Sequence, residues 1–326
     1  MPRPSWSVAE YVERLRATDR VALGRAITLV ESTLAADRTR AAEILQALGP
    51  PARPAVRIGL TGVPGVGKST LIEALGRHLV ENEGRRLAVL AVDPSSPLTH
   101  GAILGDKTRM PFLSTHPAAF VRPSATGGAL GGVARRTREV AQLCEAAGFD
   151  TILIETVGVG QSETAVRGLT DCFVLLLLAG AGDELQGIKK GIMEMADVLA
   201  VTKADGPNVA RARTAAREVA NALHLLRAPE GGWLPPVLTC SATELTGIAE
   251  LWTSIADFID HQRRTGAFER QRQQQQRTAL RELIRQELEA RFYARPEVSA
   301  ALPALESAVA EGRITAAAAA ERLLGL

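Results

Sequence analysis

Nine consecutive residues limit the possible folds of this chain more than any other feature: Gly62-Val63-Pro64-Gly65-Val66-Gly67-Lys68-Ser69-Thr70. They fit the pattern G-x-x-x-x-G-K-[ST], in which glycines let main-chain N–H groups wrap around a phosphate. An aliphatic run ends near Thr61 and a helical pattern begins near Lys68, which is the context that the motif needs. A glycine-rich loop that binds nothing is the alternative. We predict a site in which Lys68 bridges the β- and γ-phosphates and the Ser69 hydroxyl binds Mg²⁺.

Short aliphatic runs alternate with amphipathic helical patterns from Val56 onward. The runs that predict strands are residues 56–60, 87–92, 151–154, 173–178, 198–201 and 237–239. They lack polar alternation, which is typical of strands that are covered on both faces. Alternating strands and helices predict an α/β fold with a doubly wound, mostly parallel sheet. The chain is therefore predicted to be a P-loop NTPase of the SIMIBI-like kind.

Helical segments are expected on both sides of this domain. Residues 1–50 form a predicted helical extension, in which Ser7 and Glu10 have the spacing of a capping box. Residues 51–262 would be the P-loop domain, and residues 263–326 a C-terminal helical arm. Residues 261–291 predict one long, largely solvated helix with a narrow apolar seam of Leu280, Leu283, Ile284 and Leu288. Such a helix packs on another subunit or folds back on its own domain.

The composition excludes several classes of protein. The 38 basic and 36 acidic residues give a formal charge of +2, which offers no electrostatic argument for a nucleic-acid partner. Three cysteines lie far apart in the sequence, which argues against a disulfide framework and favours a reducing compartment. The N-terminal residues lack the apolar core of a signal peptide, and the longest apolar run, residues 172–181, is too short to cross a bilayer. We expect a cytoplasmic protein without a membrane segment.

Three carboxylates are candidates for the magnesium site that accompanies a P-loop. Asp93 and Glu155 each follow a predicted strand, and Asp106 precedes Lys107 and Arg109 in a loop. Ligands of open parallel sheets gather at the carboxyl ends of the strands, so Asp93 and Glu155 can reach the same pocket. An acidic residue after a strand can also be a simple helix cap.

A candidate switch begins at Glu155. The run Glu155-Thr156-Val157-Gly158 resembles the D-x-x-G motif of GTPases with Glu in place of Asp, so the Gly158 N–H group is expected to meet the γ-phosphate. Val159 stands where Ras-like enzymes have the glutamine that orients water, and the nearest glutamine is Gln161. We therefore expect slow intrinsic hydrolysis. Lys107, Arg109 and Lys189 are candidates for stabilising charge in the transition state.

Two further loops predict that the base is guanine. Thr202-Lys203-Ala204-Asp205 matches [NT]-K-x-D after a predicted strand. The Asp205 carboxylate can accept hydrogen bonds from guanine N1–H and the 2-amino group, which adenine does not offer in that place. The Lys203 stem can lie over the ring. Ser241, Ala242 and Thr243 follow the next strand, where a backbone N–H would meet guanine O6.

Taken together, these motifs resemble the MeaB/ArgK family of G proteins, the GTPase chaperones of adenosylcobalamin-dependent acyl-CoA mutases. The resemblance covers nearly the whole chain. Its most specific segments are residues 92–97, 103–110, 130–134, 155–163 and 180–191. It implies that Asp93, Asp106 and Glu155 serve magnesium and the switches.

The resemblance also implies a partner and an assembly. Residues 180–190 would be an additional switch loop that couples the nucleotide state to the mutase, with Gln186 and Lys189 as the residues involved. From the residues alone, this stretch is only a polar loop that enters a helix. The family further implies a homodimer built with the C-terminal arm. The chain departs from the family at Thr202, which replaces Asn, and at His100, which replaces a second Gly.

Four functions are compatible with the motifs. The first is a GTP-hydrolysing regulator that gates cobalamin loading, retention or repair in an acyl-CoA mutase. The second is a metal-inserting GTPase chaperone, which would need clustered His or Cys ligands, whereas the five histidines are scattered. The third is a kinase of a small molecule or protein, which would need an acceptor pocket and a base. The fourth is a nucleotide-dependent scaffold with negligible hydrolysis.

Overall fold

The computed structural model describes residues 6–51, 53–92, 110–122, 130–156, 162–179, 190–226 and 232–326. The chain forms two compact units, Met1–Gln273 and Gln274–Leu326, and each is described by itself. Within the described residues, no helix has the length and apolar character needed to cross a membrane.

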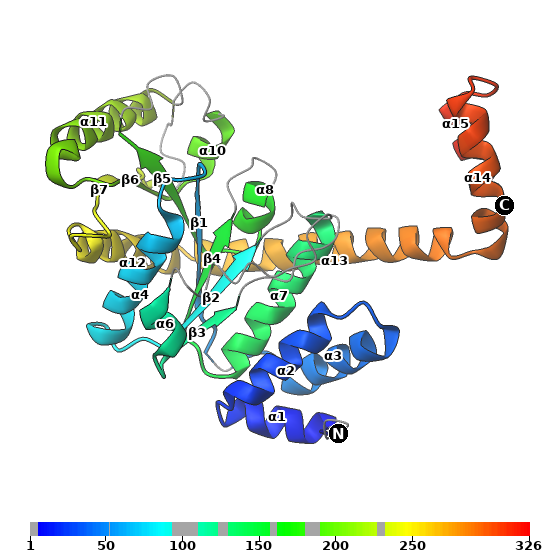
Figure 1. Cartoon of the computed structure of the whole chain (residues 1–326), viewed down its shortest axis with the longest axis horizontal. Coiled ribbons are helices and arrows are strands. Elements are labelled where there is room, and N and C mark those ends of the chain that lie inside the picture. Colours follow the sequence, from blue (N-terminus) through cyan, green and yellow to red (C-terminus); the bar gives the residue numbers. More distant parts are fainter. Residues whose placement is uncertain are drawn as a thin grey trace. The chain divides into compact units, whose positions relative to one another are not determined.

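The first unit is built on a seven-stranded sheet with the order β3-β2-β4-β1-β5-β6-β7 (Figure 1). Its strands are β1 (Val56–Gly62), β2 (Leu87–Val92), β3 (Ala119–Arg122), β4 (Thr151–Thr156), β5 (Cys172–Leu178), β6 (Val198–Thr202) and β7 (Val237–Thr239). All pairings between these strands are parallel. The predicted doubly wound sheet is therefore confirmed. The sequence missed β3, a four-residue edge strand in which buried and half-buried side chains alternate.

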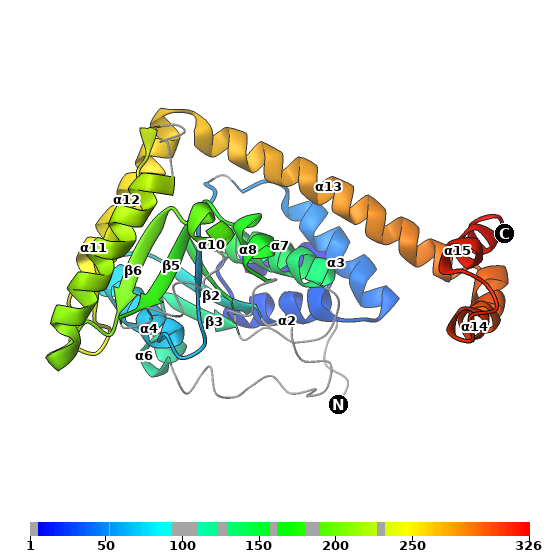
Figure 2. The ribbon, with the colours of Figure 1, turned by 90° about the horizontal axis from the view of Figure 1, so that it is seen from above.

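Helices cover both faces of the sheet because alternate side chains of each strand point to opposite faces. On β5, Val174 and Leu176 join the core cluster beneath α4 (Lys68–Glu81), α6 (Pro111–Thr115) and α12 (Ile248–Arg264). Phe173 and Leu175 face the other side, which is covered by α7 (Leu130–Ala146), α8 (Ser162–Arg167), α10 (Lys190–Met195) and α11 (Val209–Leu226). Figure 2 shows the sheet between these two layers.

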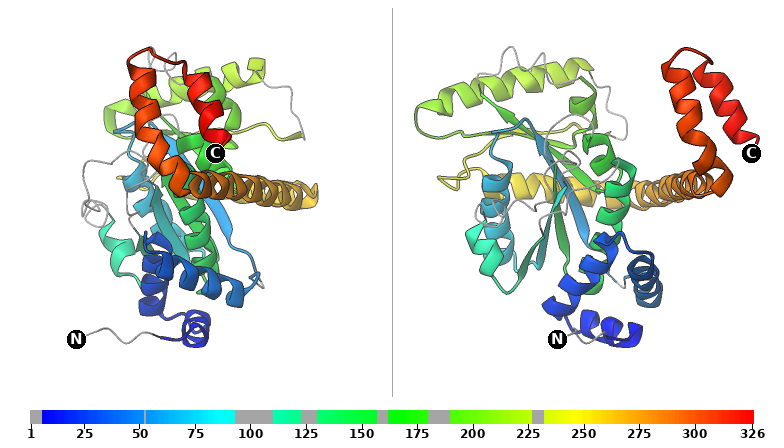
Figure 3. Two further views of the ribbon diagram at one scale, coloured as in Figure 1. Left: turned by 90° about the vertical axis from the view of Figure 1, so that its right-hand side faces the viewer. Right: turned by 45° about the vertical axis from the view of Figure 1, so that its right-hand side comes forward.

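The N-terminal helices belong to the same unit and pack on α7. They are α1 (Val8–Arg16), α2 (Arg20–Glu31) and α3 (Ala35–Leu48). The predicted capping box is confirmed, because the Ser7 Oγ atom accepts from Glu10 N–H at 3.2 Å and Ser7 N–H donates to Glu10 Oε2 at 2.6 Å. Leu23, Ile27 and Ile44 are buried in one cluster with α7 residues. The right-hand view of Figure 3 shows these helices beside the lower end of α7.

The C-terminal region differs from the sequence prediction in one respect. Helix α12 continues to Arg264, and Gly266 adopts a φ of +66° before α13 (Ala267–Tyr293) begins. The single helix predicted over residues 261–291 was therefore wrong at its start. Helices α14 (Pro296–Ala310) and α15 (Ala316–Leu324) follow. On α13, Leu280, Ile284 and Leu288 are 59%, 51% and 63% exposed, so most of the predicted apolar seam faces solvent.

Candidate guanine-nucleotide site

The predicted phosphate loop joins the end of β1 to the first residue of α4, at the carboxyl edge of the sheet. Glycines are required by both contact and conformation. A Cβ atom at Gly62 would lie 2.7 Å from the Leu176 carbonyl oxygen, and Gly67 has a φ of +96°. A side chain at either position would therefore force the loop open. Because α4 starts at Lys68, its N-terminal N–H groups face the space that the loop surrounds.

Lys68 is buried at the base of this loop. Its ammonium group donates to the carbonyl oxygens of Gly62 at 2.7 Å and Val63 at 3.2 Å. Burial lowers the pKa of Lys68, and the nearby Glu155 and Glu163 carboxylates oppose that effect. The ammonium is thus held beside the loop by carbonyls and by two acidic groups.

Ser69 and Glu155 meet across β1 and β4. The Ser69 hydroxyl donates to Glu155 Oε1 at 2.9 Å, and both residues are buried. One strand position further, the Thr156 hydroxyl donates to Thr61 Oγ1 at 2.9 Å. A hydroxyl and a carboxylate oxygen in contact are the hard oxygen donors that Mg²⁺ prefers, so this pair fits the predicted metal site.

The base-recognition loop is tied directly to the phosphate loop. The Thr202 hydroxyl donates to the Val66 carbonyl oxygen at 2.7 Å, and the Leu177 carbonyl oxygen lies 3.2 Å away. Lys203, which follows, has a φ of +54°, and its Cε atom lies 4.0 Å from where a Cβ of Gly67 would be. The Lys203 stem therefore runs beside the phosphate loop. The departure at Thr202 keeps a connection between the two loops.

Asp205 is oriented by hydroxyl groups from the loop after β7. Ser241 and Thr243 both donate to Asp205 Oδ2, at 2.6 and 3.0 Å. These hydrogen bonds lower the pKa of Asp205, with Ser241 the larger cause. The carboxylate thus stays ionised to a more acid pH than an ordinary aspartate, and both hydroxyls hold the same one of its two oxygens. The sequence placed Ser241, Ala242 and Thr243 near the base but did not predict that two of them would hold Asp205.

We expect Thr202→Val to weaken the binding of GTP and GDP equally, by about 5–10-fold. Valine keeps the shape of threonine but leaves the buried Val66 carbonyl without its donor, so the base loop loses its connection to the phosphate loop. Fluorescence titration with labelled nucleotides measures the effect. Thr202→Ser, which keeps the hydroxyl, is the matched control, and equal affinities for the valine and serine variants would contradict the role of this bond.

The sequence singled out no role for Glu163, which is 2% exposed in the first turn of α8. Its carboxylate is close enough to influence Lys68 electrostatically. An acidic residue eight positions after Glu155, at the start of a short helix, is the only sequence signal. We assign it no role.

Several predicted residues lie outside the described residues. They are Asp93, His100, Asp106, Lys107, Arg109, Gly158, Gln161, Gln186 and Lys189. Each is in a segment that follows the carboxyl end of a described strand, namely β2, β4 or β5.

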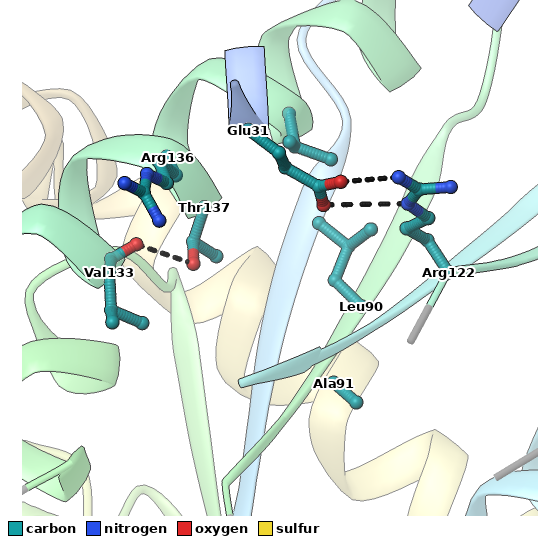
Figure 4. Close-up of a pocket in the computed structure, with 8 residues that line it drawn as sticks. Glu31, Leu90, Ala91, Arg122, Val133, Arg136 and Thr137 are labelled. Atoms are coloured by element: carbon teal, nitrogen blue, oxygen red, sulfur yellow. Dashed lines mark hydrogen bonds and ion pairs between the residues drawn. The ribbon is translucent and has the colours of Figure 1, made fainter. Parts of the chain in front are cut away.

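A separate pocket lies between the end of α2, the ends of β2 and β3, and α7 (Figure 4). Glu31 and Arg122 point toward each other there and form an ion pair. The pocket contains none of the residues predicted to bind nucleotide. Its ion pair instead connects the N-terminal helices to the edge strand.

A phosphate loop, a fixed guanine-type carboxylate and a Ser69–Glu155 pair at one sheet edge define the class of protein as a P-loop GTPase. The sequence model of the family described as "Methylmalonyl Co-A mutase-associated GTPase MeaB" matches residues 23–297. The chain belongs to this family, and it is a GTPase that binds guanine nucleotides.

Known proteins agree with this assignment. The chain is 48% identical to the GTPase ArgK of Escherichia coli over 282 residues, which cover 86% of this chain and 85% of that protein. It is 45% identical to the mitochondrial methylmalonic aciduria type A homolog of Mus musculus, over 94% of this chain and 76% of that protein. The solved structure named "LAO/AO transport system kinase" is 37% identical, with a TM-score of 0.77, and covers 100% of this chain and 99% of its own.

Proposed function

We propose that this GTPase gates the loading, retention or repair of the cobalamin cofactor in an adenosylcobalamin-dependent acyl-CoA mutase. The observation that carries the proposal is the connection of Asp205 and Thr202 to the phosphate loop, in a chain whose family is associated with methylmalonyl-CoA mutase. A guanine site joined to the phosphate site suits a switch, because the two ends of the nucleotide then act on one rigid frame. The direction of gating follows from which nucleotide state binds the mutase more tightly.

In this proposal, residues 62–70 hold the phosphates and Lys68 neutralises charge on the β- and γ-phosphates. Ser69 and Glu155 would hold Mg²⁺, together with Asp93 and Asp106, and the Gly158 N–H group would contact the γ-phosphate. Bound Mg²⁺ supplies positive charge next to the phosphate oxygens. No glutamine stands at position 159, so intrinsic turnover is expected to be slow until the partner completes the site.

The segment between β5 and α10 is proposed to couple the nucleotide to the partner. It leaves the sheet at the carboxyl end of β5, the strand that pairs with β1 on the other side of the phosphate loop. Gln186 and Lys189 lie in this segment. Its place next to the phosphate loop supports a role in sensing nucleotide state.

We expect Gln186→Ala and Lys189→Ala to leave GTP affinity unchanged and to reduce the mutase's stimulation of GTP turnover by about 10-fold or more. Single-turnover hydrolysis with and without purified mutase measures this effect. Glu194→Ala, in the helix that follows, serves as a comparison outside the segment. Full stimulation of both segment variants would refute the coupling role, and turnover that never responds to any acyl-CoA mutase would refute the proposed function.

We also propose a homodimer in which residues 263–326 form a dimerisation arm, in addition to the GTPase domain of residues 51–262 and the helical extension of residues 1–50. The exposed row of Leu280, Ile284 and Leu288 supports this, because three large apolar side chains at helical spacing gain by being covered. Light scattering should give twice the chain mass of 34.6 kDa, and a mass of one chain would contradict the dimer.

One observation bears on the metal-inserting alternative. Among the described residues, no group of three or more His, Cys, Asp or Glu side chains is arranged to hold a metal ion. Cys144, Cys172 and Cys240 are each buried and separate. The regulator of a mutase is therefore the function that we propose.

A further inference from the structure

Four charged side chains meet at the amino ends of the strands, on the edge of the sheet opposite the phosphate loop. Arg57 comes from β1, Glu145 from the last turn of α7, Asp171 from the residue before β5, and Arg272 from the start of α13. The Glu145 and Asp171 side chains are each 1% exposed. Two positive and two negative groups balance, which is the condition for burying charge without a large desolvation cost.

The Asp171 carboxylate is fully used. Arg272 donates from Nε to Oδ1 at 2.8 Å and from Nη2 to Oδ2 at 2.6 Å, and the Arg57 N–H group donates to Oδ2 at 2.8 Å. Arg272 Nη2 also reaches the Ala55 carbonyl oxygen at 2.6 Å, and Gln271 donates to the Thr170 carbonyl oxygen at 2.8 Å. The start of α13, within the first unit, is thereby held against the beginnings of β1 and β5.

Glu145 is only half used. Its Oε1 atom accepts from Arg57 Nε at 3.1 Å and Nη2 at 2.9 Å. Its Oε2 atom is buried and accepts no hydrogen bond from the described residues. A buried carboxylate oxygen without a donor is unfavourable by itself, so its retention calls for an explanation. Burial would lower the pKa of Arg272, but Asp171, Glu145 and Glu269 raise it above its ordinary value, so Arg272 interacts with both buried carboxylates.

We propose that Arg272 is a two-position latch: it grips Asp171 in this structure, and Glu145 Oε2 is a second acceptor that it reaches when the start of α13 shifts toward α7. In one position, α13 is held by the beginning of β5. In the other, it is held by the end of α7. The two carboxylates thus define two discrete places for the base of the arm helix.

The latch connects the arm to the nucleotide edge through two rigid elements. Helix α7 follows β3 and returns from the carboxyl edge of the sheet, so its first residues lie on the nucleotide side and Glu145 on the opposite side. Strand β5 runs from Asp171 toward the segment that carries Gln186 and Lys189. A movement of α7 relative to β5 would change which carboxylate Arg272 prefers. This inference needs GTP and GDP binding but not the mutase, so it can fail separately from the proposed function.

Hydrogen exchange of the full chain, followed by mass spectrometry of peptides from residues 267–285, tests the latch with GDP and with a non-hydrolysable GTP analogue. We expect the wild-type protein to show different protection in the two states. Glu145→Gln removes the second ionised acceptor and should make protection the same in both states. Glu139→Gln, on the same helix and in an ion pair with Arg135, is the matched control and should retain the difference.

Arg272→Gln gives a second, independent readout. It should lower the protection of residues 267–273 by on the order of 10²-fold in both nucleotide states, because it leaves two buried carboxylates without their common partner. Circular dichroism and GTP binding confirm that each variant is folded. A nucleotide-dependent difference that persists in Glu145→Gln, or that is missing from the wild-type protein, would overturn the latch, as would unchanged protection in Arg272→Gln.

Discussion

Replacing Lys68 with methionine is expected to lower the rate of GTP hydrolysis by about 10²–10³-fold, the effect of removing one preorganised charge from a phosphoryl-transfer site. The ammonium group is held by the Gly62 and Val63 carbonyls at the mouth of the phosphate loop, next to the start of α4. No other described side chain of the loop carries a positive charge. Triphosphate binding should weaken as well, since the same group attracts the phosphates in the ground state.

Methionine is chosen because Lys68 is 8% exposed and its stem is packed. Lys68→Ala would remove the same charge and also leave a cavity, so its effect would mix chemistry with packing. Arg77→Met, which removes a cationic side chain further along the same helix, is the control. Steady-state phosphate release measures all three. Turnover within a factor of two of the unchanged protein in Lys68→Met would mean that the phosphate loop does not serve hydrolysis.

Asp205→Asn is the second change with a large expected effect: GTP affinity should fall by on the order of 10²-fold and affinity for xanthosine triphosphate should rise. The Ser241 and Thr243 hydroxyls hold one carboxylate oxygen and would hold the amide oxygen of Asn in its place. The amide NH₂ group then points toward the base, where guanine has an amino group and xanthine has a carbonyl. The mismatch with guanine and the match with xanthine come from the same geometry.

Competition titrations with GTP, GDP, ATP and xanthosine triphosphate measure this exchange of preference. Asp260→Asn, an exposed change on α12, controls for the loss of one negative charge. If Asp205→Asn keeps the original order of affinities, guanine is not recognised by this carboxylate.

The parts of the fold that depend on neighbouring residues could be predicted from the sequence. The phosphate loop, the buried strands and the capping box at Ser7 each carry a local pattern, and each is present in the structure. Helix α13 shows the limit of such patterns. A glycine in a polar, helix-forming stretch does not reveal whether it interrupts the helix, and at Gly266 the interruption is visible only as a positive φ.

Contacts between distant residues could not be predicted. Asp205 and Ser241 are 36 positions apart, and Asp171 and Arg272 are 101 positions apart. Nothing in either local sequence indicates the other, because the pairing depends on strand order and on where each strand begins. The strand β3 was missed for a related reason: its four residues form a strand only because the edge of β2 offers hydrogen-bonding groups.

The central claim is that this chain binds a guanine nucleotide through its phosphate loop and Asp205, and calorimetry of the full chain with Mg²⁺ tests it most directly. We predict saturable heat with GTP and with GDP, and none with ATP at the same concentration. Absence of binding heat with both guanine nucleotides, or equal heat with ATP, would contradict it.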